Sequence, residues 1–335
     1  MKIRQDDAVK HWDWKWEEAR STPEPKPASE VPEPLRKPGR PSLPRQSVRR
    51  RRLAAALVGA MLLVLLIVLI AGGGSAQHPR ASAGALSSTH VRAAPHLTPA
   101  QSEAVAGAAE ERAINHVLSY TPAVTAGGRS GNEVALTFDD GPGPYTQRLV
   151  RVLNNLHVKA TFFAIGEEER YFSAGTRLEL ESGDAVGDHT ETHPMMATLS
   201  AHDQREELFE QIARIELLGG PRPRLFRPPY GSFDATTFKE LRALHLLMVL
   251  WSTDTRDYTR PGVPAIVQSA LLGAHPGAII LMHDAGGERA ETIAALPLIV
   301  AGLRKRGLHP VTVPRLMLDD PPPRGLPIPT SLAGD

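Results

Sequence analysis

From Glu133 onward, short apolar runs alternate with longer segments whose apolar residues recur at helical spacing. The short runs predict seven strands, at residues 134–138, 160–165, 185–188, 225–226, 246–251, 278–282 and 309–313. The longer segments predict helices around residues 147–156, 167–180 and 292–305, and a further helix that Ser200 caps and Gly219-Gly220 ends. Such alternation is typical of an α/β fold with a parallel sheet or barrel.

One apolar run near the N-terminus is of a different kind. Residues 53–70 carry no charge, and Arg49 to Arg52 stand immediately before them. About 20 apolar residues span a bilayer and basic flanks stay cytoplasmic, so residues 49–72 are predicted to be a transmembrane signal anchor. A buried core helix would show a polar stripe, and a signal peptide cleaved near Ser75 and Ala76 would have a shorter basic region. We therefore expect a single-pass protein of the cell membrane with a cytoplasmic N-terminus.

Composition divides the rest of the chain. Residues 1–48 are charged and Pro-rich, and they are predicted to be a disordered cytoplasmic tail because such a tract buries little apolar surface. Residues 73–131 are predicted to be an extracytoplasmic linker with one helix near 99–120, which Thr98 caps. The strand and helix region, 132–318, is expected to fold as one domain, and residues 319–335 to form a second Pro-rich tail.

Composition also excludes several functions. The chain has no cysteine, which excludes a disulfide scaffold, cysteine-ligated zinc and a cysteine nucleophile. Its formal net charge is +1, so no overall basic field indicates a nucleic-acid partner. No G-x-S-x-G motif is present, and serine hydrolysis therefore has no support.

Polar side chains gather where the predicted strands end. They follow five of the strands in turn: Asp139-Asp140, then His189 and His193, then Arg227 and Tyr230, then Asp254 and Asp257, and then His283. The carboxyl ends of parallel strands form the rim where the active sites of such barrels lie. Surface charges at random positions would not recur at the ends of successive strands. We therefore expect these side chains to form one site.

Two histidines of this set are spaced like metal ligands. His189 and His193 stand four residues apart, which is a weak signal alone because pairs of surface histidines are common. A zincin helix has its glutamate directly after the first histidine, whereas Glu191 lies one position further on. Pro194 also argues against a continuous helix here. A metal site here therefore needs a third ligand from another strand end.

Asp139 and Asp140 are the source of that ligand. Because side chains alternate along a strand, two adjacent carboxylates face one site only if the following turn bends, which Gly141 allows. One carboxylate would complete a ligand set with a position open for water, and the other would take the proton of that water. Alone, the dipeptide could equally be an acidic surface turn.

Five polar segments follow one another along the chain. They read Thr137-Phe138-Asp139-Asp140-Gly141-Pro142, His189-Thr190-Glu191-Thr192-His193, Arg227-Pro228-Pro229-Tyr230, Asp254-Thr255-Arg256-Asp257-Tyr258 and Leu281-Met282-His283. In this order they resemble the motifs of the NodB-type polysaccharide deacetylases, carbohydrate esterase family four. The resemblance covers about residues 133–315 and implies a distorted (β/α) barrel, in agreement with the seven strands that the pattern predicts.

The resemblance also implies roles for the residues of the first motifs. Asp139 would be the general base, and Arg227 would orient it. Asp140, His189 and His193 would hold a divalent metal. That ligand set suits Zn²⁺, with Co²⁺, Mn²⁺ and Fe²⁺ as alternatives.

The later motifs would supply the acid and the walls of the site. By the same resemblance, His283 would be the general acid, tuned by Asp257, and the backbone N–H of Tyr230 would stabilise the oxyanion. Leu281 and Tyr258 would line the pocket for the acetyl methyl group, although the family often has tryptophan at the position of Tyr258.

The expected function is metal-dependent removal of N-acetyl groups from an extracellular amino-sugar polysaccharide. An enzyme anchored in the membrane and facing outward would meet peptidoglycan or a chitin-like glycan. One alternative is O-deacetylation of xylan or another acetylated glycan. Another is a catalytically silent wall-binding module, against which the intact Asp139, His189, His193 and His283 argue.

Overall fold

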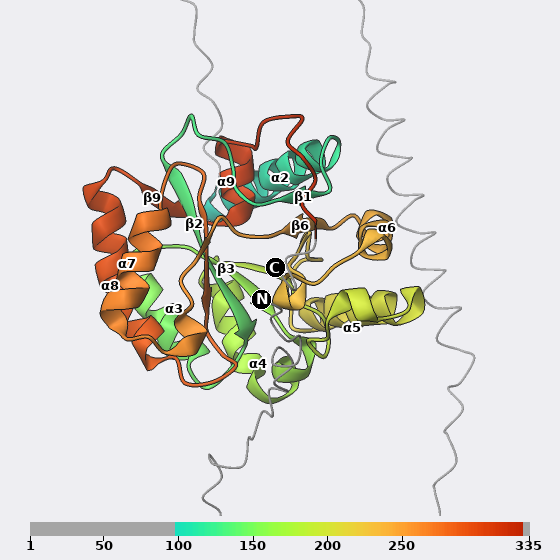
Figure 1. Ribbon diagram of the computed structural model, residues 1–335, viewed down its shortest axis with the longest axis horizontal. Helices are drawn as coiled ribbons and strands as arrows, with labels where there is room; N and C mark the ends of the chain where they lie inside the picture. The colour runs from blue at the N-terminus through green and yellow to red at the C-terminus, as the bar shows by residue number, and fades with distance from the viewer. Residues whose placement is uncertain (1–97, 331–335) are drawn as a thin grey trace, which may run out of the picture. The chain divides into compact units, whose positions relative to one another are not determined.

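The computed structural model describes residues 98–330 (Figure 1). The predicted cytoplasmic tail, the predicted anchor at 49–72 and most of the predicted linker lie outside the described residues. Within residues 98–330, no helix has the length and apolar character needed to cross a membrane.

A parallel sheet forms the centre of the described part, with helices around it (Figure 1). Its strands are β1 (Ala123–Val124), β2 (Glu133–Gly141), β3 (Thr161–Ala164), β4 (Ala185–Asp188), β5 (Leu225–Phe226), β6 (Leu247–Val249), β7 (Thr253–Asp254), β8 (Ile279–His283) and β9 (His309–Val311). They pair in the order β1-β6-β5-β4-β3-β2-β8-β7, and β9 also pairs with β2. Because all of these strand ladders are parallel, every strand presents its carboxyl end to the same rim of a half-barrel.

Helices follow most of the strands. They are α2 (Pro99–Leu118), α3 (Thr146–Asn155), α4 (Gly166–Glu181), α5 (Ala201–Leu217), α6 (Ala235–Leu244), α7 (Val263–Gly273), α8 (Ala290–Lys305) and α9 (Val313–Asp319), with short 3-10 turns η2 (Met196–Thr198), η3 (Pro229–Gly231) and η4 (Asp257–Thr259). The two N-caps predicted from the sequence are present. The hydroxyl of Thr98 accepts a hydrogen bond from the backbone amide of Gln101, and the hydroxyl of Ser200 accepts one from the backbone amide of Asp203.

The α/β class predicted from the sequence is confirmed, and so are all seven predicted strands. The described residues hold nine strands rather than about seven, and the two that the sequence did not predict are β1 and β7, with two residues each. Both short strands owe their conformation to a parallel neighbour, β6 for β1 and β8 for β7.

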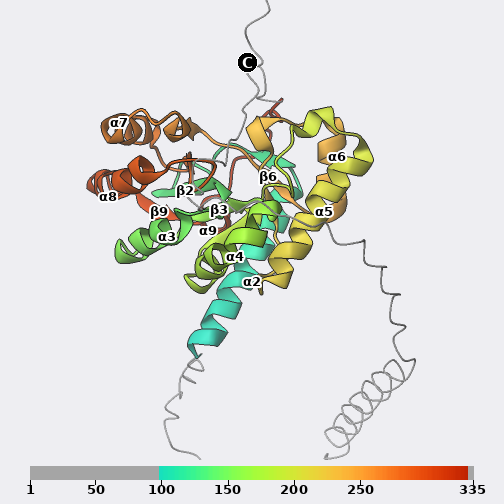
Figure 2. The ribbon, with the colours of Figure 1, turned by 90° about the horizontal axis from the view of Figure 1, so that it is seen from below.

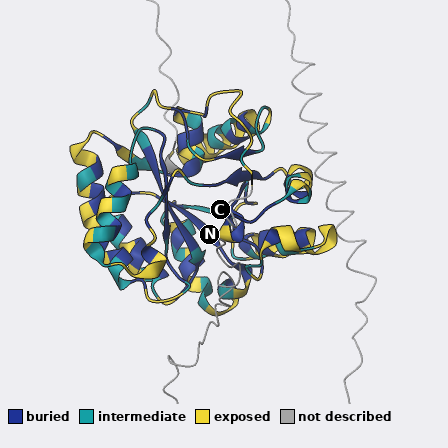
Figure 3. Cartoon of the chain, viewed as in Figure 1, coloured by how far each residue is buried: buried dark blue, intermediate teal, exposed yellow. Residues whose placement is uncertain are grey.

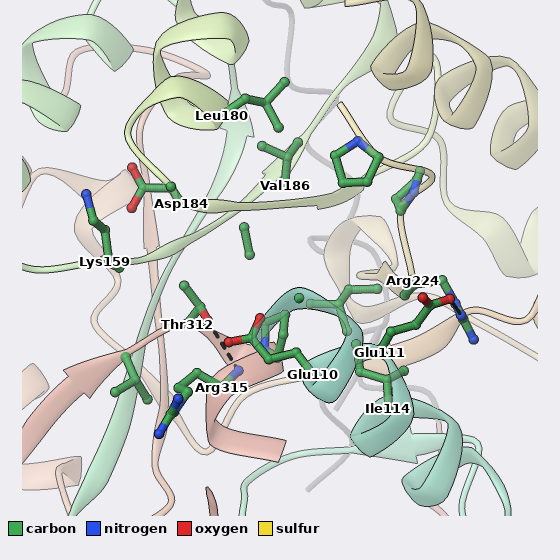
Figure 4. A pocket seen from close by; sticks show the side chains of 18 of the residues that line it. Glu110, Glu111, Ile114, Lys159, Leu180, Asp184, Val186, Arg224, Thr312 and Arg315 are labelled. Carbon is green, nitrogen blue, oxygen red and sulfur yellow. Dashed lines mark hydrogen bonds and ion pairs between the residues drawn. The ribbon is translucent and has the colours of Figure 1, made fainter. Parts of the chain in front are cut away.

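Side chains alternate along β2 between two cores, as a strand buried on both faces requires. Val134, Leu136 and Phe138 pack in a cluster with α3, α7 and α8. Ala135 faces the other way, into a cluster with α2 and α9. Thr137 and Asp139 have the same parity as Ala135 and therefore face the inside of the half-barrel. Figure 3 shows the strands buried and the exposed residues on the outer faces of the helices.

The segment before β2, which the sequence places in the linker, packs on the sheet. Ile114 and Val117 of α2 lie in one apolar cluster with Leu316 of α9, and the two helices lie side by side (Figures 1 and 2). The residue that follows α9 is bound to the segment before β2, because the carboxylate of Asp320 accepts hydrogen bonds from the backbone amides of Ser130 and Gly131. Packing of this kind needs the whole sheet and cannot be read from local composition.

Candidate active site

Asp139 is the first of the predicted site residues at the rim. It lies at the end of β2, where it stands in register with His283 of β8, and it is 4% exposed. Its Oδ1 accepts a hydrogen bond of 2.7 Å from Nη1 of Arg227. The same Nη1 donates to the hydroxyl of Thr137 at 2.8 Å. A buried carboxylate with this partner is held in one orientation.

Arg227 is itself fixed from all sides. Its side chain is fully buried, its Nε donates to the carbonyl of Val249 at 2.9 Å, and its Nη2 donates to the carbonyl of Leu250 at 3.2 Å. The guanidinium also lies 4.2 Å from the centroid of the Phe163 ring. Backbone carbonyls, a carboxylate and an aromatic face together compensate the burial of the charge.

Asp140 points to the same rim although it is adjacent to Asp139. The bend is at Asp140 itself, whose φ is 72°, and the pairing of β2 with β3 shifts register between Asp139 and Gly141. The sequence indicated Gly141 as the residue that allows the bend. Instead, Gly141 leaves room for Asp284, because a Cβ at position 141 would lie 2.3 Å from a carboxylate oxygen of that residue.

Asp140, His189 and His193 come together at this point. Their ligand atoms lie within 4.8 Å of one another, and Oδ1 of Asp140 is 3.6 Å from Nε2 of His189 and 3.2 Å from Nε2 of His193. Burial acts to raise the pKa of Asp140, but the neighbouring imidazoles of His193 and His189 hold that pKa well below its usual range. The carboxylate is therefore ionised, as a metal ligand must be.

The donor set fits a divalent metal. Nδ1 of His189 lies 2.7 Å from the carbonyl oxygen of Arg227, which only accepts, so Nδ1 carries the proton and the Nε2 lone pair is free to bind. Nδ1 of His193 is 3.2 Å from the hydroxyl of Tyr230, which orients the second ring. Tetrahedral ligands about 2.1 Å from an ion are about 3.4 Å from each other. The two distances from Oδ1 of Asp140 to the imidazole nitrogens, 3.6 and 3.2 Å, are close to this value.

His283 faces this cluster from β8 and is bound to Asp257. Nδ1 of His283 is 2.8 Å from Oδ1 of Asp257, and the amide of His283 donates to Oδ2 of Asp257 at 2.9 Å. Thr292 of α8 donates to the same Oδ2 at 2.7 Å. Burial acts to lower the pKa of His283, but the charge and hydrogen bond of Asp257 raise it to about 9. The imidazole is therefore protonated at neutral pH.

The remaining predicted residues line the rim. Tyr230 lies in η3 with a φ of 58° and is 48% exposed. Tyr258 lies in η4, and its ring meets that of His283 edge-on with centroids 5.2 Å apart. Leu281 is buried in β8. Asp254 accepts from the amide of Arg256 at 2.8 Å and so supports the turn that leads to η4.

Backbone strain is concentrated in these segments. Positive φ angles occur at Asp140, Thr190, His193, Tyr230 and Arg256, none of which is glycine. Such conformations persist only where the surrounding structure holds them, and they are frequent at functional sites.

Two further residues of the rim carry no role in the sequence prediction. Asp284 follows His283, is fully buried and accepts a hydrogen bond from Thr146, next to Gly141. Glu191 lies between His189 and His193 in the sequence and is paired with two arginines. Their position beside motif residues was the only signal in the sequence. Within the described residues, His157, His202, His245 and His275 are not part of the cluster of Asp140, His189 and His193.

Comparison with known proteins agrees with this geometry. The family model described as polysaccharide deacetylase matches residues 126–249. A peptidoglycan-N-acetylglucosamine deacetylase of Bacillus cereus is 36% identical over 195 residues, which cover 55% of this chain and 87% of the relative. A chitooligosaccharide deacetylase of Sinorhizobium fredii is 34% identical over 202 residues, or 57% of this chain and 94% of the relative.

Two other similar proteins show the range of the relatives. A bifunctional xylanase/xylan deacetylase of Cellvibrio japonicus is 36% identical over 186 residues, which cover 55% of this chain but 27% of the relative. The crystal structure of a pseudoenzyme of carbohydrate esterase family four from Bacillus anthracis superposes with a TM-score of 0.55 at 30% identity, covering 58% of this chain and 68% of that one. The similarity to relatives matched over most of their own length, together with the fold and the rim residues, shows that the chain belongs to the polysaccharide deacetylase family and is an enzyme of that class.

Proposed function

We propose that this enzyme hydrolyses N-acetyl groups of an extracellular amino-sugar polysaccharide, peptidoglycan or a chitin-like glycan, and that it uses a divalent metal, with Zn²⁺ the first candidate. The observation that carries the proposal is that Asp139 and His283 stand in register on neighbouring strands, beside the cluster of Asp140, His189 and His193. A base, a ligand set and an acid thus share one rim.

The first half of the reaction is the attack of water on the acetyl carbonyl. A bound divalent metal supplies Lewis acidity that makes water nucleophilic near neutral pH and polarises the carbonyl. Asp139 takes the proton of the attacking water, and Arg227 keeps the accepting carboxylate aimed at it. The oxygen of the former carbonyl becomes negative, and the backbone N–H of Tyr230 donates to it.

The second half is the loss of the amine. The C–N bond breaks once its nitrogen has gained a proton, and His283, protonated through its pairing with Asp257, gives that proton. The products are acetate and a sugar with a free amine. The exposed ring of Tyr230 and the partly exposed ring of Tyr258 border the space in which the sugar would lie.

The substrate class rests on the relatives and on the sequence. Those matched over most of their length are named for peptidoglycan and for chitooligosaccharides. A membrane anchor at residues 49–72, which we also propose, would place the enzyme beside the cell wall. O-deacetylation of xylan is the second candidate, favoured by the match to a xylan deacetylase. A silent module is disfavoured because base, ligands and acid are all present.

The test is acetate release by the purified protein from peptidoglycan, chitooligosaccharide and acetylated xylan, measured side by side. We expect release from an amino-sugar substrate, loss of activity after chelation, and recovery with Zn²⁺, Co²⁺ or Mn²⁺. Release only from xylan would make the enzyme an esterase. Full activity after thorough metal removal would overturn the metal-dependent mechanism.

A further inference from the structure

Glu191 stands between the two histidine ligands, yet the proposed reaction gives it no role. Its side chain is 3% exposed, so its charge is withdrawn from water. A buried carboxylate that binds neither substrate nor metal needs partners of its own.

Two arginines supply those partners from two different helices. The guanidinium of Arg214 in α5 makes a bidentate pair with the carboxylate, with Nη2 donating to Oε1 at 2.6 Å and Nε donating to Oε2 at 3.1 Å. Arg170 of α4 donates from Nη2 to Oε1 at 2.6 Å. The carboxylate is thus turned to the helices, while the imidazoles on either side of it in sequence reach Asp140.

The backbone of the ligand segment is bound to the same two helices. The amides of Gly166 and Glu167, at the start of α4, donate to the carbonyls of Thr190 and Glu191 at 3.0 and 2.8 Å. The amide of Glu191 donates to the carbonyl of Glu207 in α5 at 3.1 Å. The backbone conformation of the ligand segment therefore depends on the relative position of α4 and α5.

Gly166 is the residue that lets the carboxylate reach this place. A Cβ at position 166 would lie 1.8 Å from Oε2 of Glu191, so no larger residue fits without displacing the pair. The carboxylate of Glu191 packs closely against the first residue of α4. An ion pair on an exposed helix surface has no such steric constraint.

We propose that Glu191, clamped by Arg214 and Arg170, is a positioning residue for the histidine ligands and sets the affinity of the site for its metal. The ion pairs of Glu191 with Arg214 and Arg170, here called the clamp, stabilise the left-handed backbone conformations at Thr190 and His193. These conformations direct both imidazoles towards Asp140. This inference rests on the proposed metal site. Partners beyond the direct ligands typically change metal affinity by about 10- to 100-fold when they are removed.

The experiment is a measurement of Zn²⁺ affinity by competition with a chromophoric chelator, on the purified full-length protein. We expect Arg214→Ala to raise the Kd for Zn²⁺ roughly 10- to 100-fold. Arg170→Ala should raise it less, because Arg170 makes one hydrogen bond and its side chain is 53% exposed. The absorption spectrum of the Co²⁺-loaded variant should shift if the histidines have moved.

A matched control lies on the same helix. Arg205 of α5 also donates from Nε to a buried carboxylate, that of Glu240 on α6, at 2.7 Å. Arg205→Ala removes one hydrogen bond from a largely exposed arginine to a buried carboxylate, as Arg170→Ala does, but without touching the ligand segment. Its Kd should equal that of the wild type. Equal weakening by Arg205→Ala would overturn the proposal, since loss of stability alone would then explain the effect.

The outcomes separate the two hypotheses. If the wild type does not bind Zn²⁺, the proposed metal site fails. If the wild type binds and folded Arg214→Ala binds equally well, only the clamp is refuted. Should Arg214→Ala not fold, Arg214→Lys, which keeps the charge but loses the two-point pair, must show a smaller rise in Kd or the proposal fails.

Discussion

The guanidinium of Arg227 holds Oδ1 of Asp139 at 2.7 Å, while Oδ1 of the adjacent Asp140 faces the two imidazoles of His189 and His193. One peptide unit thus separates a carboxylate bound to an arginine from a carboxylate bound to the ligand cluster. This difference in partners is the reason why we propose Asp139 as the base and Asp140 as the metal ligand.

The first prediction follows from that division. Asp139→Asn should keep the metal, because Asp140 and the histidines are untouched, but it should lower kcat by roughly 10²- to 10⁴-fold through loss of the base. Asp140→Ala should weaken metal binding, so that excess metal partly restores its rate. Metal content and kcat of both purified variants, at low and high metal, are the measurements.

His283→Ala is the companion variant, since it should retain metal and lose turnover like Asp139→Asn. If Asp139→Asn loses the metal while Asp140→Ala keeps both metal and rate, the two roles are the reverse of those assigned.

The second prediction concerns pH. Burial alone would lower the pKa of His283, and Asp257 raises it to about 9, so the imidazole is protonated below that pH and loses its proton above it. A general acid works only when protonated, so kcat should fall as the pH rises through that range. In Asp257→Asn the fall should begin at lower pH. An alkaline limb that does not move in the variant would rule out this pair as the acid.

The third prediction concerns stability. Glu169 is 2% exposed, its Oε2 has no hydrogen-bond partner within the described residues, and burial raises its pKa from 4.5 to about 7. Because the folded pKa is the higher one, the stabilisation is complete below pH 4.5 and is lost as the pH rises to about 7. The loss is at most about 3.5 kcal/mol, at about 1.4 kcal/mol per pKa unit.

Glu169→Gln should therefore gain stability relative to the wild type as the pH rises from 5 to 8. Urea unfolding of both proteins at these two pH values measures the difference. Glu167→Gln, an exposed position of the same helix, is the control and should show no such change. Parallel stability curves for Glu169→Gln and the wild type would show that this carboxyl titrates normally.

The fourth prediction concerns topology and rests on the apolar run that follows Arg49 to Arg52. Protease added to intact cells should degrade the deacetylase domain and leave a tag at the N-terminus protected. A domain that is protected until the cells are lysed would contradict the proposed orientation. A mature protein that begins near Gln77 would show that the anchor is cleaved.

The sequence alone was enough to predict seven of the nine strands in the described residues and the segments of the rim. Strand periodicity and helix caps are local properties, and Thr98 and Ser200 cap their helices as predicted. The rim could be located because the carboxyl ends of parallel strands meet at one edge, whatever the details of packing. His189 and His193 were found in this way although the segment between them is not helical.

What only the tertiary structure decided are relationships that depend on distant residues. The left-handed backbone of Asp140, the use of Gly141 to make room for Asp284, and the pairing of Glu191 with Arg214 involve contacts between separate elements. The packing of α2 against α9 joins segments from the two ends of the domain in the same way. The sequence determined the periodicity and the chemical types, because these are encoded in neighbouring residues. The three-dimensional fold decided which carboxylate faces which partner, because that choice depends on the space left by side chains far away in sequence.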